Sequence, residues 1–213
     1  MTNGAPKSSL HRVTSEARPL LLASSSRHRK ALLARLQLPF THQAPAIDET
    51  ARPGESPSDL VGRLALAKAR AAAVPPAGPA LVIGSDQVAF IDGRILGKPG
   101  TRHAALQQLG DAAGKAVEFL TGVCVLDQAT ARSQVEVVSC TVVFRALTAA
   151  QIAAYVDAEQ PWDCAGSFKA EGLGIALFEK IVTDDPTALI GLPLIRLVTM
   201  LAAFGCDVLT LQR

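Results

Sequence analysis

Two long runs of strand-like sequence, residues 117–126 and 135–144, constrain the fold of this chain most. Both are rich in Val and other apolar residues, and apolar and polar residues alternate most clearly in the second run. Such alternation is typical of a β-strand that buries one face. Because helical patterns precede and follow these runs, the chain is expected to be a mixed α/β protein with a long, partly antiparallel sheet.

Shorter patterns predict the other elements. Ser56 with Pro57 indicates a capped helix start, Thr148 with Gln151 matches a capping box, and Asp92-Gly93 between apolar runs indicates a hairpin. The other expected strands cover residues 19–23, 80–91, 94–96, 176–182 and 208–211. The expected helices cover residues 26–38, 57–73, 101–110, 148–158 and 193–204, and residues 42–57 are expected to form a loop.

Composition limits the classes of ligand. Of the 213 residues 49% are apolar but only 4% are aromatic, so the core must consist of Leu, Val, Ile and Ala, which suits a central sheet covered by helices. A chain of this length can form one large domain or two closely packed lobes. The formal net charge of +2 gives no electrostatic footprint for a nucleic acid polymer or an anionic membrane. A small anion held by a local cluster of positive groups is the expected ligand.

The ends of the chain and its cysteines indicate a cytoplasmic protein. Residues 1–18 are polar and lack the apolar region of a signal peptide, so we expect a disordered extension before a domain that covers residues 19–213. The apolar stretch 189–204 contains Pro193 and Arg196 and is too short to span a bilayer. The cysteines are widely spaced without a C-x-x-C pair, and we expect reduced core or surface residues.

The predicted helix after Ser26 begins with Arg27, His28, Arg29 and Lys30. Basic residues are unfavourable there because the N-terminus of a helix carries partial positive charge. They are reasonable if a phosphate binds to this turn, with free N–H groups and serine hydroxyls such as that of Ser24 around it. The alternative is a solvated basic turn.

Asp86 lies on an otherwise apolar strand face, because Val82, Gly84, Val88 and Phe90 share its side of the strand. A buried carboxylate needs a cation or hydrogen-bond donors nearby. Asp86 is therefore a metal ligand, a general base or one half of a structural salt bridge.

Lys68 and Lys98 are candidate phosphate ligands. Lys68 continues the helical row of Leu60 and Leu64, so it either faces a cleft or extends outward to solvent. Gly97-Lys98-Pro99 resembles part of a phosphate-binding loop, but its spacing and Pro99 exclude a P-loop.

Taken together, these positions combine cations with acids. The cations are Arg29, Lys30, Lys68 and Lys98, and the acids are Glu49, Asp86 and Glu171. A metal-assisted phosphoanhydride hydrolase needs this combination, since cations hold phosphates while carboxylates bind the metal and activate water.

At these residues the sequence resembles the Maf family of nucleotide pyrophosphatases over roughly residues 19–209. The matching motifs are Leu-Ala-Ser-Ser-Ser at 22–26, Asp-Glu-Thr at 48–50, the element around Lys68, Gly-Ser-Asp-Gln at 84–87, Gly-Lys-Pro at 97–99, Ala-Gly-Ser-Phe at 165–168 and Gly-Leu-Pro-Leu at 191–194. Residues 85–87 and 164–172 look like the branch that hydrolyses 7-methyl-GTP. This branch usually has Pro followed by an aromatic residue where the chain has Arg27-His28. The difference bears on which base the protein prefers and how tightly it binds.

The resemblance implies a two-lobed α/β fold around a long curved mixed β-sheet, similar to inosine triphosphatase, with a nucleotide cleft between the lobes and often a homodimer. It implies that Asp86 and Glu49 are catalytic and bind a divalent metal, Mg²⁺ or Mn²⁺. Ser24, Arg29, Lys68 and Lys98 would hold the triphosphate, and His28, Gln87 and Glu171 would select the base. The expected reaction converts 7-methyl-GTP to 7-methyl-GMP and pyrophosphate. The alternatives are hydrolysis of dTTP, UTP or another triphosphate, and a nucleotide-binding regulator of division without turnover.

Overall fold

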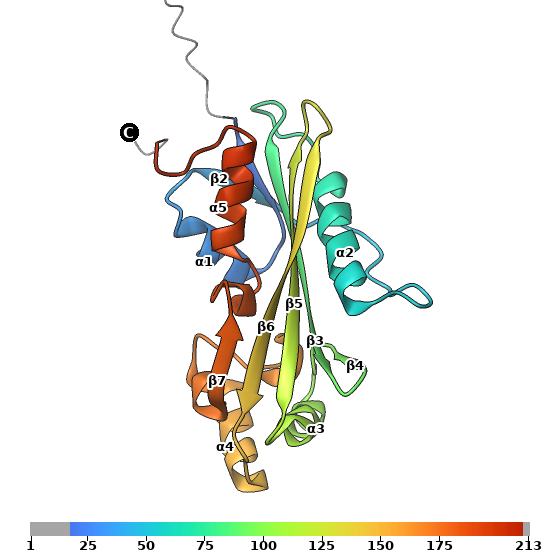
Figure 1. Ribbon diagram of the computed structural model, residues 1–213, viewed down its shortest axis with the longest axis vertical. Helices are drawn as coiled ribbons and strands as arrows, with labels where there is room; N and C mark the ends of the chain where they lie inside the picture. The colour runs from blue at the N-terminus through green and yellow to red at the C-terminus, as the bar shows by residue number, and fades with distance from the viewer. Residues whose placement is uncertain (1–17, 211–213) are drawn as a thin grey trace, which may run out of the picture.

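The computed structural model describes residues 18–210 of the chain (Figure 1). The predicted disordered extension lies outside the described residues except for its last position, Arg18. The Arg18 guanidinium donates to the carboxylate of Asp127 at 2.5 Å. This contact connects the start of the described chain to the sheet through Asp127.

The centre of the molecule is a seven-stranded sheet with the order β2-β1-β3-β5-β6-β7, in which β4 pairs separately with β3. The strands are β1 (Leu20–Ala23), β2 (Phe40–Gln43), β3 (Leu81–Ile91), β4 (Arg94–Leu96), β5 (Ala116–Asp127), β6 (Ser133–Phe144) and β7 (Phe178–Thr183). β1 runs parallel to β2 and β3, whereas the other pairs are antiparallel. The prediction of a long, partly antiparallel sheet is confirmed.

Five α-helices of the described chain cover this sheet. They are α1 (Arg27–Ala34), α2 (Pro57–Ala71), α3 (Arg102–Ala112), α4 (Ala149–Glu159) and α5 (Leu194–Ala203), with short 3₁₀ helices at η1 (Ala165–Ser167), η2 (Leu173–Leu177) and η3 (Ala188–Ile190). Ser56 caps α2 and Thr148 forms a full capping box at α4, as the sequence predicts.

Alternate residues of β3 face different helices, because successive side chains of a strand point to opposite faces. Leu81 and Ile83 belong to a core cluster formed with α1 and α5. Val82 belongs to another cluster formed with α2. Figure 1 shows α2 on one side of the long strands and α1 with α5 on the other. The face of β3 that carries Val82 also carries Asp86, which therefore lies toward α2.

Two lobes share the long strands. One lobe contains the cluster around α1 and α5 and the cluster around α2, while the other contains a cluster around α3 and α4 with the aromatic residues Phe119, Phe144 and Phe168. β3, β5 and β6 run between these ends of the molecule (Figure 1). The two-lobed α/β fold predicted from the sequence is confirmed.

Several local predictions are wrong. The loop predicted over residues 42–57 begins too early, because residues 42–43 belong to β2, a half-exposed edge strand without an apolar pattern. α1 ends at Ala34 rather than near Leu38, since Gln37 takes a left-handed conformation with φ of 55° as the chain turns toward β2. Residues 208–210 form a turn instead of the predicted strand, and Leu211 lies outside the described residues.

None of the helices in residues 18–210 is long and apolar enough to cross a bilayer. Cys124, Cys140 and Cys206 are buried free thiols and Cys164 is half-buried, which agrees with the prediction that they are reduced core or surface residues.

Candidate active site

A break in strand pairing opens a cleft beside β3. β1 pairs with residues 81–83 of β3, and β4 pairs with residues 89–91. Within the described chain, residues 84–88 have a neighbouring strand on the β5 side alone. The cleft along this stretch has a volume of about 890 Å³, which suits a small-molecule ligand. Side chains from both faces of β3 can therefore reach the same cavity.

Lys68 joins two acids on the α2 side of the cleft. Its Nζ donates to Oδ1 of Asp86 at 2.6 Å and lies 2.8 Å from Oε1 of Glu49. Asp86 and Lys68 are 8% and 7% exposed, whereas the Glu49 side chain is 60% exposed. The hydrogen bond from Lys68 holds the pKa of Glu49 below its usual value despite partial desolvation. Asp86 therefore forms the buried salt bridge that the sequence allows, and it also lines the cavity.

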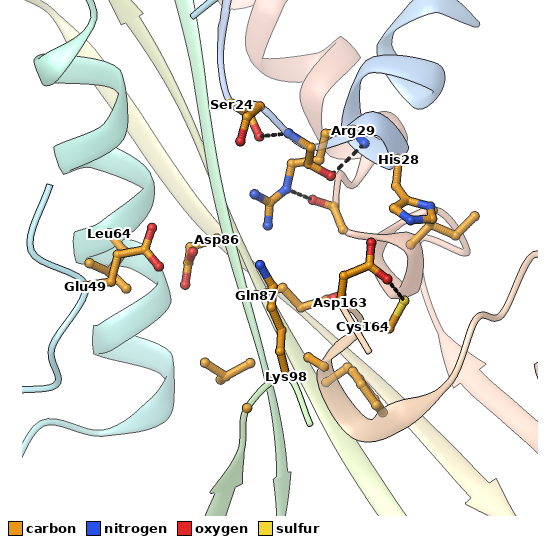
Figure 2. A pocket seen from close by; sticks show the side chains of 18 of the residues that line it. Ser24, His28, Arg29, Glu49, Leu64, Asp86, Gln87, Lys98, Asp163 and Cys164 are labelled. Carbon is orange, nitrogen blue, oxygen red and sulfur yellow. Dashed lines mark hydrogen bonds between the residues drawn. The ribbon is translucent and has the colours of Figure 1, made fainter. Parts of the chain in front are cut away.

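The basic first turn of α1 lies on the opposite side of β3 (Figure 2). Ser26 caps this helix by accepting from the Arg29 backbone N–H at 3.4 Å, and no acidic residue lies in the first turn. The Nε of Arg29 donates to the Gly191 carbonyl at 2.8 Å, which directs the guanidinium toward the cavity. Burial lowers the pKa of Arg29, while Asp86 and Glu49 raise it. An arginine remains charged under these conditions, so the turn attracts anions.

The base-selecting residues predicted from the sequence occupy another part of the wall. The Nδ1 of His28 contacts Oε1 of Glu171 in a close pair. Beside it, Arg27 lies 3.6 Å from Asp163. Burial raises the pKa of the neighbouring Cys164 thiol to about 12, so this thiol stays protonated at neutral pH and is no nucleophile.

Gln87 points to the side of β3 away from Asp86 (Figure 2). Its Nε2 lies 2.9 Å from the Thr121 hydroxyl, 2.8 Å from the Ala188 carbonyl and 3.2 Å from the Leu189 carbonyl. The amide nitrogen is therefore engaged within the protein. The carbonyl oxygen of Gln87 is the atom that can accept a hydrogen bond from a ligand.

The two carboxylates fit a metal ion that arrives with phosphate. Residues 18–210 contain no cluster of three or more His, Cys, Asp or Glu side chains that could hold a metal. However, oxygens of Asp86 and Glu49 converge on one ammonium group, which shows that both reach the same point. Mg²⁺ is commonly held by one or two carboxylates together with substrate phosphates and water. This donor set matches that pattern.

The structure brings all nine predicted site residues to one cavity: Ser24, His28, Arg29, Glu49, Lys68, Asp86, Gln87, Lys98 and Glu171. Lys30 instead lies near His42, with 3.4 Å between Nζ and Nε2. Asp163, which sequence reasoning missed, also lines the cleft, as does Gly191, which the sequence placed in a family motif without a role in the site. Asp163 lies in a loop without any local pattern, while the positive φ of 114° at Gly191 explains its glycine.

Known proteins resemble this chain over nearly all of its length. The family described as Maf-like protein matches residues 19–204. The chain belongs to the Maf family. A 7-methyl-GTP pyrophosphatase of Pseudoalteromonas translucida strain TAC 125 is 54% identical over 91% of this chain and 96% of its own length. Proteins of the same name from Pseudomonas fluorescens strain Pf-5 and Pseudomonas aeruginosa strain PAO1 are 57% and 56% identical, each over 89% of this chain and 98% of the relative. This member of the family therefore keeps the resemblance along nearly its whole length.

Proposed function

We propose that this Maf protein hydrolyses a nucleoside triphosphate to the monophosphate and pyrophosphate, with 7-methyl-GTP as its preferred substrate. The observation that carries the proposal is the convergence of Lys68, Asp86 and Glu49 in a cleft whose far wall presents His28 and Glu171. Relatives with 54–57% identity are named 7-methyl-GTP pyrophosphatases. We assign the reaction to the cytoplasm and allow for a homodimer.

The triphosphate would lie between α1 and the loop that carries Lys98. Arg29, Lys68 and Lys98 all line the cavity, and Ser24 with the first turn of α1 adds polar groups. Ser24 Oγ accepts from the Ser26 N–H at 3.1 Å, which fixes the turn before the helix. Preorganised cations of this kind stabilise the negative charge that shifts onto the leaving pyrophosphate.

Asp86 is the group that we assign to proton transfer. Its Oδ1 accepts from Lys68, so Oδ2 would take a proton from the attacking water while the water oxygen bonds to the α-phosphorus and the bond from that phosphorus to the leaving pyrophosphate breaks. The products are then the monophosphate and pyrophosphate. A bound Mg²⁺ or Mn²⁺ would neutralise phosphate charge, and Glu49 and Asp86 are the residues that would hold it.

Glu171 suits a 7-methylguanine base for two reasons. A carboxylate can accept hydrogen bonds from guanine N1–H and N2–H₂, and its charge complements the positive charge that N7 methylation adds. His28 contacts Glu171 and can stack on the base, and Gln87 offers its carbonyl oxygen. The imidazole covers less area than the aromatic residue usual in this branch, so the strength of base selection depends on His28.

The reaction is tested with purified protein, Mg²⁺ or Mn²⁺ and a panel of 7-methyl-GTP, GTP, dTTP, UTP and ITP. We expect monophosphate and pyrophosphate as products, formed fastest from 7-methyl-GTP. Faster hydrolysis of dTTP or UTP would keep the chemistry but overturn the preferred base. Binding without turnover of any nucleotide would favour the regulatory alternative.

Asp86→Asn tests the assigned proton transfer in the same assay. Removal of a general base typically costs between about 100-fold and 10,000-fold in rate, so we expect kcat to fall by about 100-fold or more. Asp163→Asn is the matched control, because Asp163 lines the cleft but has no assigned role in the chemistry. Normal kcat in Asp86→Asn would show that another group accepts the proton.

A further inference from the structure

Gln108 of α3 contacts two segments that reach different parts of the cleft. Its Oε1 accepts from the Ser167 hydroxyl at 2.5 Å, and its Nε2 donates to the Gly97 carbonyl at 3.2 Å. Because a carbonyl oxygen only accepts, the amide nitrogen must face Gly97, and Ser167 must then donate to the amide oxygen. The neighbours therefore fix the orientation of this amide, and both of its ends are engaged.

The two segments carry the two ends of the proposed substrate site. Gly97 directly precedes Lys98, which lines the cavity as a candidate phosphate ligand. Ser167 belongs to η1, and the chain continues from it to Glu171, the candidate base ligand. Asp163 and Cys164, which begin this second segment, line the cavity together with Lys98 (Figure 2). Gln108 is thus a side chain that touches both segments without lining the cavity itself.

Ser167 needs this partner. Its side chain is fully buried, and its backbone has a φ of 64°, in the left-handed region. A buried hydroxyl requires a hydrogen-bond partner, and a residue other than glycine keeps such a conformation only when its surroundings hold it. The contact with Gln108 therefore helps to hold the turn from which the chain proceeds to Glu171.

A second link joins the same two segments. The Gly100 N–H donates to the Trp162 carbonyl at 3.1 Å. Because this link involves only backbone atoms, it persists when the Gln108 side chain is shortened. Loss of the side chain is therefore expected to change the spacing of the segments rather than to separate them.

We infer that Gln108 is a positioning residue that sets the spacing between Lys98 and Glu171, so that one ligand engages both residues at once. This inference rests on the proposed function, because it uses the roles assigned to these two residues. The inference predicts that long and short ligands respond differently to loss of the Gln108 side chain. A ligand that occupies only one end of the site does not depend on the spacing, whereas a nucleotide that occupies both ends does.

The test compares Gln108→Ala with Gln107→Ala, which removes an exposed side chain from the preceding position of the same helix. We expect Gln108→Ala to raise the KM for 7-methyl-GTP roughly fivefold or more, because simultaneous contact at both ends is impaired. The kcat should fall by a smaller factor than KM rises, since Asp86, Arg29 and Lys68 lie on other elements and keep their positions. Inhibition constants for inorganic tripolyphosphate and for 7-methylguanosine, which each fill one end, should stay at the wild-type values. Gln107→Ala should behave like the wild type throughout.

Ser167→Ala is the second variant, because it removes one of the two contacts and leaves Gln108 in place. It should raise KM in the same direction, and the double variant should be no worse than Gln108→Ala. If Gln108→Ala does not fold, Ser167→Ala decides the question alone. An unchanged KM, or inhibition constants for the two fragments that rise as much as KM, would overturn the inference. Absence of turnover in the wild type would instead refute the proposed function and the inference with it.

Discussion

Lys68 is a buried ammonium group whose environment differs sharply from that of an ordinary surface lysine. It lies between Asp86 at 2.6 Å and Glu49 at 2.8 Å, and its side chain is 9% exposed. Lys115 forms a pair of similar length with Asp92, at 2.7 Å, but the two side chains are 47% and 55% exposed. Removing one partner of a buried pair leaves an uncompensated charge, whereas surface pairs contribute little. Burial rather than distance therefore decides the importance of each pair.

Lys68→Met is expected to destabilise the protein by about 3 kcal/mol, because Asp86 would remain buried without its counter-ion. It should also remove triphosphate binding. Lys115→Met is the control and should cost no more than about 1 kcal/mol. Urea unfolding at neutral pH, followed by circular dichroism, measures both. Equal losses for the two variants would mean that Asp86 does not depend on Lys68.

At the scale of elements, the approach of α2 to the sheet depends on two glycines. A Cβ at Gly84 of β3 would lie 2.0 Å from the Ala65 carbonyl oxygen, and one at Gly122 of β5 would lie 2.3 Å from that of Val61. These contacts involve the backbone of α2, which cannot move aside as a flexible side chain can. The same close approach brings Lys68 of α2 to Asp86 of β3, so packing of the helix and geometry of the site have one cause.

Gly84→Ala is therefore expected to lower the free energy of unfolding by about 3 kcal/mol or more, since overpacking forces backbone shifts. Gly110→Ala provides the opposite case, because Gly110 lies within α3 and a Cβ there meets no atom within 4 Å. Alanine favours a helix over glycine by about 0.8–1 kcal/mol, so this control should gain stability. Chemical denaturation of both variants checks the contrast. A neutral Gly84→Ala would show that α2 can shift away from β3 without cost.

At the scale of the whole molecule, the sequence could predict elements with strong periodicity and residues with unusual neighbours. The strands β3, β5 and β6 follow from such patterns, whereas for Lys68 the helical row leaves both an inward and an outward position open. The sequence could not predict β2, whose half-exposed residues lack a pattern, or the approach of Asp163 to the cleft. It also could not reveal that, among residues 18–210, β3 has no second neighbouring strand beside Asp86, because strand pairing depends on contacts distant in the chain. The roles of the site residues stay predictions that the assays must test.

The last prediction concerns both lobes, because a nucleotide in the cleft would contact residues of each. Ligands that bind only the folded state stabilise it by about 2.7 kcal/mol at 100 times their Kd. For a protein of this size each kcal/mol raises Tm by about 2–4 °C, so saturation should raise it by roughly 5–10 °C. Thermal melts with Mg²⁺ and the two products, 7-methyl-GMP and pyrophosphate, measure this shift without turnover. Pyrophosphate alone should give a smaller shift, because it reaches only the side of Arg29, Lys68 and Lys98.

Removal of the metal with EDTA should abolish most of either shift in Tm, since Glu49 and Asp86 would otherwise repel the phosphates. Shifts that persist unchanged in EDTA would show that the phosphates bind through the cations alone.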